Sequence, residues 1–242
     1  MLSAWTTQEL LLAWGIVAAG ALIQGAVGLG MGLVAVPVLL LIDPVFVPGP
    51  MLGCALALTF SMIMRERRSV DLLGLKWGLL GRLVGTAIAS LLMVRMSQDV
   101  ISVASALLVL VAVVLSLSGW RLIPNSGVLL GVGTVSGIMS TFSSVGGPPI
   151  ALLYQDEEGP RLRATLSGYL IFGSIVSLVG LVLVGRFGRD ELIATAFLLP
   201  AVAAGFVLSG PALSVLDRGY TRKAVLLISA VTSASLLLKT LG

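Results

Sequence analysis

Apolar runs of about membrane-spanning length follow one another along almost the whole chain. The sequence contains eight such runs, and the short breaks between them hold most of the charged residues. Only 11% of the 242 residues are charged, against about 25% in soluble domains, and the mean hydropathy is +1.10. Because a helix needs roughly 20 apolar residues to cross a bilayer, the sequence predicts an all-α integral membrane protein that forms one membrane domain.

Several classes of chemistry are excluded by what the composition lacks. The chain has no histidine and a single cysteine, Cys54, which removes histidine-based acid–base catalysis and cysteine- or histidine-based metal sites. It contains no Walker loop for ATP. The net charge of +4 comes from basic residues in short loops, where attraction to anionic lipid explains it better than nucleic acid does. We therefore expect no enzyme, no cofactor, no metal and no nucleic-acid partner.

The order of the runs repeats once along the chain. A long apolar run at residues 10–42 is interrupted by a glycine-rich stretch at 25–32, and a second long run at 128–154 is interrupted at 143–149. Three ordinary apolar runs follow each broken one. The two interruptions lie 116 residues apart, measured from Gly30 to Gly146. A duplicated unit is the simplest account, and it predicts an N-terminal repeat at 1–122 and a C-terminal repeat at 123–242.

The distribution of Lys and Arg tests how the repeats are oriented. If all eight runs cross the membrane, the basic residues divide eight to six between the two sides. If each broken run dips in and returns, the repeats become inverted and the division is ten to four. The positive-inside rule favours the second arrangement. It predicts six full spans and two broken hairpins, with both termini outside, as in transporters built from inverted repeats.

The two interruptions are the predicted binding site. A helix that begins inside the membrane points unpaired N–H groups and a partial positive charge at whatever lies there, and two facing starts suit a small anion. Polar side chains nearby would add donors. The alternative is that the glycines only allow close helix packing. The predicted substrate-binding residues are Gln24, Gly28, Gly30, Gly32, Thr141, Ser143, Ser144, Gly146 and Gly147, and the predicted helix breaks are Pro37, Pro148 and Pro149.

One basic residue, Arg82, lies inside an apolar run. A charge at that position is costly in a membrane and usually functional. If its side chain faces a cavity, it attracts an anion and joins the binding site. If its side chain extends back to the nearby basic loop, it only snorkels to the interface. The sequence leaves both interpretations open.

The same segments resemble the TauE/SafE sulfite-exporter family of bacterial membrane permeases. The resemblance rests on residues 24–37 (QGAVGLGMGLVAVP), on their counterpart at 137–149 (GIMSTFSSVGGPP), on 160–172 and on the glycine-spaced stretch 78–85. It places Gly28, Gly30, Gly32 and Pro37 in the first motif, and Gly146, Gly147 and Pro148 in the second. Met31 stands where the family more commonly has a third consecutive glycine, and its bulk would narrow the site.

The resemblance implies secondary transport of small sulfur anions, such as sulfite, sulfoacetate and other sulfonates, across the bacterial inner membrane by alternating access. A passive anion channel or a carboxylate transporter would use the same donors, and an intramembrane enzyme or assembly factor is a further alternative. The expected partners are a small anion, the lipid bilayer, a coupling proton and a second copy of the chain in a homodimer.

Overall fold

The computed structural model describes residues 5–65, 76–120, 122–154, 159–216 and 220–241. These residues form helices joined by short connections and contain no strand. The first half contains α1 (Thr7–Val27), α2 (Met31–Ile42), the 3-10 helix η2 (Pro44–Phe46), α3 (Gly49–Arg65), α4 (Lys76–Met93) and α5 (Gln98–Ser118). The second half contains α6 (Ser126–Ser143), α7 (Gly147–Ala151), α8 (Gly159–Leu183), α9 (Arg189–Leu216) and α10 (Tyr220–Leu241).

Local sequence signals explain where several helices begin and end. Thr6 and Glu9 form a capping box at the start of α1, and the side chains of Ser97 and Asn125 accept backbone N–H groups at the starts of α5 and α6. Gly28 and Gly119 end α1 and α5 in the left-handed conformation. Each half therefore follows the predicted order of one broken element and then three helices.

The exterior of the bundle is apolar, as a membrane protein requires. Five helices in the described part of the chain are long and apolar enough to cross a membrane, namely α1, α5, α6, α8 (over Ala164–Leu183) and α9 (over Arg189–Pro211). α2 and α3 are shorter apolar helices. Large hydrophobic side chains such as Leu91, Leu183 and Val207 are exposed on the outer surface. Both α1 and α6 are thus long enough to cross a membrane.

Each broken element turns back on itself. The indole N–H of Trp5, just before α1, donates to Asp43 at the end of α2 over 2.8 Å, so α1 and α2 form an antiparallel pair. In the second half, α7 returns alongside α6. A Cβ atom added at Gly78 would lie 3.7 Å from Ile150 of α7 and 3.8 Å from the Leu129 carbonyl oxygen of α6. In each broken run the segment after the interruption packs against the helix before it, α2 against α1 and α7 against α6. The inversion of the two repeats stays a prediction.

Two helix pairs pack so closely that their backbones touch, and the two contacts match. In the α4–α6 pair, a Cβ atom added at Gly85 would lie 2.1 Å from the carbonyl oxygen of Thr134. In the α1–α9 pair, one added at Gly205 would lie 2.2 Å from the carbonyl oxygen of Ala18. Thr134 and Ala18 are 116 residues apart, the same spacing as the two interruptions. These glycines allow the two pairs of helices to approach at backbone contact.

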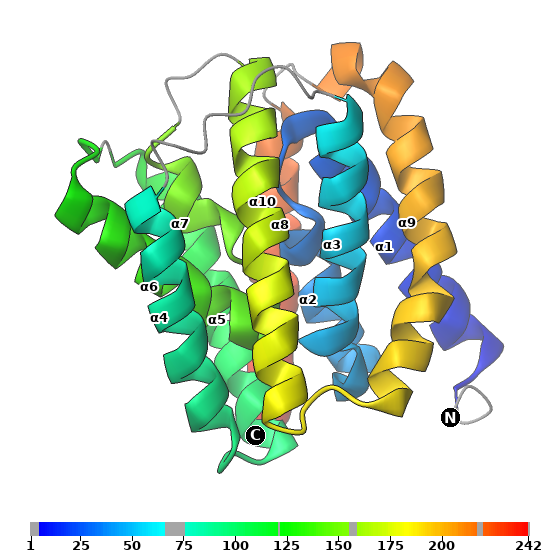
Figure 1. Ribbon diagram of the computed structural model, residues 1–242. Coiled ribbons are helices and arrows are strands. Elements are labelled where there is room, and N and C mark those ends of the chain that lie inside the picture. The colour runs from blue at the N-terminus through cyan, green and yellow to red at the C-terminus, as the bar shows by residue number, and fades with distance from the viewer. Residues whose placement is uncertain (1–4, 66–75, 121, 155–158, 217–219, 242) are drawn as a thin grey trace.

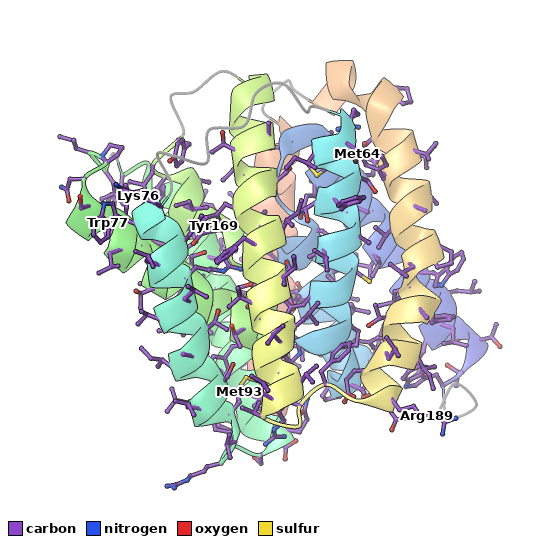
Figure 2. All side chains as sticks on the ribbon, in the orientation of Figure 1. Met64, Lys76, Trp77, Met93, Tyr169 and Arg189 are labelled. Atoms are coloured by element: carbon purple, nitrogen blue, oxygen red, sulfur yellow. The ribbon has the colours of Figure 1, made fainter. Side chains whose placement is uncertain are left out.

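The two ends of the bundle differ in the residues they present (Figures 1 and 2). Both chain ends lie at the lower end in the figures, where Met93 and Arg189 are labelled, while Lys76 and Trp77 lie at the upper end. The predicted ten-to-four division rests mostly on basic residues whose side chains the structure does not describe. The side chains of Arg67, Arg68, Arg121, Arg161, Arg163, Arg218, Arg222, Lys223 and Lys239 belong to that undescribed set.

Candidate anion-binding site

The first interruption is built by glycines rather than by proline. α1 ends at Gly28, with φ of 100°, and Gly30 precedes α2 with φ of 135°. Both values lie in the region that side chains disfavour. Pro37 was predicted as a helix break, but it lies inside α2, seven residues from the start of that helix. The prediction was wrong at this position because the positive-φ glycines already end α1 before the proline is reached.

The start of α2 points hydrogen-bond donors into the interior of the bundle. Gly30 caps the helix without a side-chain bond, and the first-turn N–H groups of any helix lack intrahelical partners. The side-chain oxygen of Gln24 accepts the N–H of Met31 over 3.1 Å. That bond uses the oxygen of the Gln24 side-chain amide, so the NH₂ group of the same amide is available to donate to a ligand. The N–H groups of Gly32 and Leu33 are the other first-turn donors of α2.

The second interruption is built differently. Ser144 adopts a left-handed conformation with φ of 59°, and its hydroxyl donates to the carbonyl oxygen of Pro48 over 2.8 Å. Pro148 and Pro149 follow Gly147 in the first turn of α7, so the helix begins there as predicted. Proline has no N–H group. The second helix start therefore offers fewer backbone donors than the first.

A small cavity lies where the two interruptions meet. Its volume is about 30 Å³, and an ordered water needs roughly 10–15 Å³ of such space. The interruptions contact each other beside it, since a Cβ atom added at Gly32 would lie 2.8 Å from Val145. We call this cavity the central pocket. It is lined by Gln24, Leu29, Gly30, Gly32, Leu33, Ala55, Ser140, Ser144, Val145, Gly146, Gly147, Pro148, Leu170 and Ser174.

Arg82 lies directly behind the wall of the central pocket. Its side chain is fully buried, which excludes snorkelling to the interface. The guanidinium group donates to the hydroxyls of Ser136 over 2.7 Å and Ser140 over 2.6 Å, and Ser140 itself lines the pocket. The guanidinium carbon also lies 5.1 Å from the ring centre of Tyr169. A Cβ atom added at Gly146 would lie 2.5 Å from Arg82 Nη1.

No opposite charge accompanies this arginine. Arg82 forms no ion pair with any residue in the described ranges, and it is the one charged side chain that is buried among them. Its Nε–H group is buried without a hydrogen-bond partner. Burying an unpaired charge in a low-dielectric interior costs several kcal/mol. The site is therefore a positive, donor-rich interior in which no described carboxylate balances the guanidinium.

Seven of the thirteen predicted residues line the central pocket, and six, Pro37 among them, do not. The lining residues are Gln24, Gly30, Gly32, Ser144, Gly146, Gly147 and Pro148. Gly28 ends α1, and Pro149 lies in α7 outside the lining. Ser143 donates to Met139 within its own helix, and Thr141 belongs to a neighbouring hydroxyl cluster. Arg82 reaches the pocket through Ser140 and Gly146.

Met31 does not narrow the pocket, contrary to expectation. Its side chain is buried against α1, where a Cβ atom added at Gly20 would lie 3.2 Å from Met31 Cγ. The sequence analysis missed three serines: Ser140 and Ser174, which line the pocket, and Ser136, which accepts a hydrogen bond from Arg82. Ser136 and Ser140 are four residues apart on α6, and this spacing places both on one helix face. Such a pair opposite a buried arginine is the signal that could have identified them.

Alanine variants of Gly146 and Gly147 test whether anion transport depends on the position of the Arg82 guanidinium or only on the space in the pocket. In Gly146→Ala the new methyl group overlaps Arg82 Nη1 and Ser140 Cβ, at 2.5 Å and 2.8 Å, and displaces the guanidinium. In Gly147→Ala the nearest atom is Leu29 Cβ at 3.6 Å, an ordinary contact. We expect Gly146→Ala to lower anion flux in proteoliposomes about tenfold or more and Gly147→Ala to retain it. Equal flux for both variants would contradict this account of Arg82.

The fold and the site together define a multi-pass helical membrane protein with an unpaired buried cation at its centre. A family model described as Sulfite exporter TauE/SafE matches residues 11–236. The chain belongs to this family of membrane transporters. The searches of curated proteins and of solved structures returned no match. The described residues contain no group of three or more carboxylate or cysteine side chains that could hold a metal ion.

Proposed function

We propose that this protein is a secondary transporter of small sulfur anions, such as sulfite and sulfonates, and that the central pocket is the binding site. The observation that carries the proposal is the buried, unpaired Arg82 beside a pocket lined with hydrogen-bond donors. An anion in the pocket supplies the counter-charge that the folded chain lacks. This attraction is strong because the surroundings are apolar and exclude water.

The donors around the pocket suit a compact oxyanion. The Gln24 amide and the first-turn N–H groups of α2 approach from one interruption, and the hydroxyls of Ser140 and Ser174 approach from α6 and α8. A sulfite or sulfonate group presents three oxygens, each of which accepts more than one hydrogen bond. Donors that converge from several helices can therefore satisfy it together. Charge-assisted hydrogen bonds of this kind are about twice as strong as neutral ones.

The structure represents a closed state in this account. A pocket of about 30 Å³ has room for one or two waters and is too small for a sulfonate. A larger cavity of about 340 Å³, which we call the vestibule, lies nearer the lower end and is lined by Asp43, Pro44, Val45, Val47, Pro48, Gly49, Met93, Gln98, Gly185, Arg186 and Glu191. Ser144 lines the pocket, and its hydroxyl bonds to Pro48 of the vestibule. Breaking this contact would open the pocket toward the vestibule.

Alternating access would follow from two inverted repeats, 1–122 and 123–242. The matched glycine contacts of α4–α6 and α1–α9 support this division, because each pair joins a helix from one repeat to a helix from the other. The opposite directions of the two broken elements support it as well: α1 begins beside Asp43 at the lower end, and α6 begins beside Gly78 of α4, near Lys76 at the upper end (Figure 2). Rocking of one repeat against the other around a fixed central site is a recurrent transporter mechanism.

A passive channel for small anions is the competing function, and counterflow distinguishes the two. Proteoliposomes are loaded with unlabelled sulfite, and the entry of labelled sulfite is followed over time. A carrier returns loaded more readily than empty, so we expect the labelled anion to accumulate transiently above its external concentration. A channel shows no such overshoot. The absence of an overshoot would contradict alternating access. We place the protein in the bacterial inner membrane. We also propose that two copies of the chain form a homodimer, and the mass of the purified protein used for reconstitution tests this.

A further inference from the structure

Three hydroxyl groups from three different helices meet one turn below Arg82. Thr141 of α6 lies 3.0 Å from Ser177 of α8, measured between side-chain oxygens, and 3.4 Å from Thr86 of α4. Thr86 and Ser177 are 3.5 Å apart. All three residues are at least 98% buried. The Thr141 proton has two acceptors within reach, the carbonyl oxygen of Gly137 at 2.9 Å and the hydroxyl of Thr86 at 3.4 Å.

Further hydroxyls extend this cluster toward both cavities. Ser174 lines the central pocket and precedes Ser177 by about one turn of α8. Ser90 follows Thr86 by about one turn of α4, and Met93 of the same helix lines the vestibule. We call Ser174, Ser177, Thr141, Thr86 and Ser90 the hydroxyl file. It runs from Ser174 in the pocket lining toward Met93 in the vestibule lining, and neither Ser144 nor Pro48 belongs to it.

The lower part of the file has an unsatisfied polar group. Ser90 is only 5% exposed, and its buried hydroxyl has no hydrogen-bond partner. It faces α8, where a Cβ atom added at Gly180 would lie 2.5 Å from Ser90 Oγ. A serine in a helix can bond to its own backbone, and Ser105 of α5 does so. A buried hydroxyl left without a partner costs about 1–3 kcal/mol, and an ordered water removes that cost.

At the three counterpart positions that the repeat spacing identifies, the other half of the chain carries no side-chain hydroxyl. The 116-residue spacing of α1 and α6 places Gly25 opposite Thr141. Gly85 and Gly205, which make matched contacts, are 120 residues apart. At this spacing Phe206 occupies the position equivalent to Thr86, and Gly210 the position equivalent to Ser90. The two halves therefore pack alike but differ in polarity along this line. A feature present in only one half is not needed for packing.

We infer that the hydroxyl file holds water molecules and carries a proton between the central pocket and the vestibule as the anion moves. This inference rests on the proposed function and names the route of its coupling ion. Each hydroxyl and each water donates one proton while it accepts another, so one proton passes along the file and no covalent bond changes overall. The chain has no histidine, and no buried carboxylate occurs among the described side chains. Hydroxyls, water and the anion itself are therefore the groups that can carry the proton.

The ionisable groups around the file lie at its two ends. Arg82 and Tyr169 stand near the pocket, on α4 and α8, and the buried Tyr169 hydroxyl has no hydrogen-bond partner. Arg186, Glu191 and Asp43 line the vestibule. The positive charge of Arg82 repels a lone hydronium ion from the upper end. An anion in the pocket offsets that charge, so proton entry should depend on the presence of the anion.

The test uses proteoliposomes with a trapped pH dye and methanesulfonate, which stays ionised at all working pH values. The wild type should show lumenal acidification that accompanies methanesulfonate entry. Thr141→Val has nearly the same shape but lacks the hydroxyl, and it should lose the acidification and the response of flux to a proton gradient. Thr141→Ser should restore both. Ser105→Ala removes a buried hydroxyl on α5 that donates to the carbonyl oxygens of Ile101 and Phe142 and to no hydroxyl of the file, so it should behave as the wild type does.

The two readouts separate this inference from the proposed function. Methanesulfonate entry into wild-type vesicles without acidification, or full acidification in Thr141→Val, overturns the hydroxyl file and leaves the anion transporter standing. A wild type that moves neither methanesulfonate nor sulfite overturns both. If Thr141→Val has a lowered melting temperature, Ser90→Ala is the second test. Its hydroxyl has no hydrogen-bond partner to lose, and loss of acidification is again the expected result.

Discussion

Replacing Arg82 by methionine should abolish anion transport without destabilising the protein. The guanidinium is the buried positive charge next to the central pocket, and no carboxylate among the described residues balances it. Loss of a buried, hydrogen-bonded charge contact to a ligand costs about 3 kcal/mol, which is roughly a hundredfold in affinity. Methionine fills a similar volume without the desolvation penalty of the charge. The melting temperature should therefore stay the same or rise.

Two measurements check this expectation, namely sulfite flux in proteoliposomes and the melting temperature in detergent with and without sulfite. Sulfite should stabilise the wild type and have no effect on Arg82→Met. Lys76→Gln is the matched control, because Lys76 begins the same helix but is exposed. That variant should transport normally. Normal flux in Arg82→Met, or a large drop in its melting temperature, would show that Arg82 supports the fold rather than the anion.

A single methyl group at Gly85 should prevent correct folding. A Cβ atom there would lie 2.1 Å from the Thr134 carbonyl oxygen and 2.9 Å from its carbonyl carbon. These are backbone atoms of α6, so the clash is relieved only by moving the whole helix. We expect Gly85→Ala to lower the free energy of unfolding by about 3 kcal/mol. Most of the protein should then be lost during membrane insertion or purification.

Gly131→Ala is the control for this effect. Gly131 lies on α6 near the same contact, but an added Cβ atom would meet nothing within 4 Å. Alanine is also a better helix former than glycine by about 1 kcal/mol, so the variant should be at least as stable as the wild type. Yield and melting temperature in detergent are the readouts. Equal values for Gly85→Ala and Gly131→Ala would refute the close α4–α6 packing.

The organisation of the bundle was predictable because it depends on strong, repeated signals. Apolar runs of near-membrane length, separated by short charged breaks, determine where most helices lie. The matching interruptions near Gly30 and Gly146 indicated where the two broken elements lie. The division into two inverted repeats stays a prediction. Lipid requires every backbone group in it to be satisfied within the protein, which leaves few alternatives to helices.

The details of the site were less predictable because they depend on contacts between helices. Proline in a helix is usually disruptive, yet Pro37 lies inside α2 while the glycines before it make the break. The burial of Arg82 was not predictable, because it depends on Ser136, Ser140 and Tyr169, which face it from α6 and α8. The sequence places Thr86, Thr141 and Ser177 in three separate runs, and only packing brings their hydroxyls together.

The most direct test of the account is anion flux through the purified protein in proteoliposomes, with sulfite, sulfoacetate, a larger sulfonate, sulfate and a plain carboxylate as substrates. The account predicts saturable flux of sulfite or a sulfonate, and loss of that flux in Arg82→Met. Saturable flux of the carboxylate alone would keep the carrier but change its substrate class. Unsaturable flux of every anion, or no flux of any, would contradict a transporter that binds sulfur anions at Arg82.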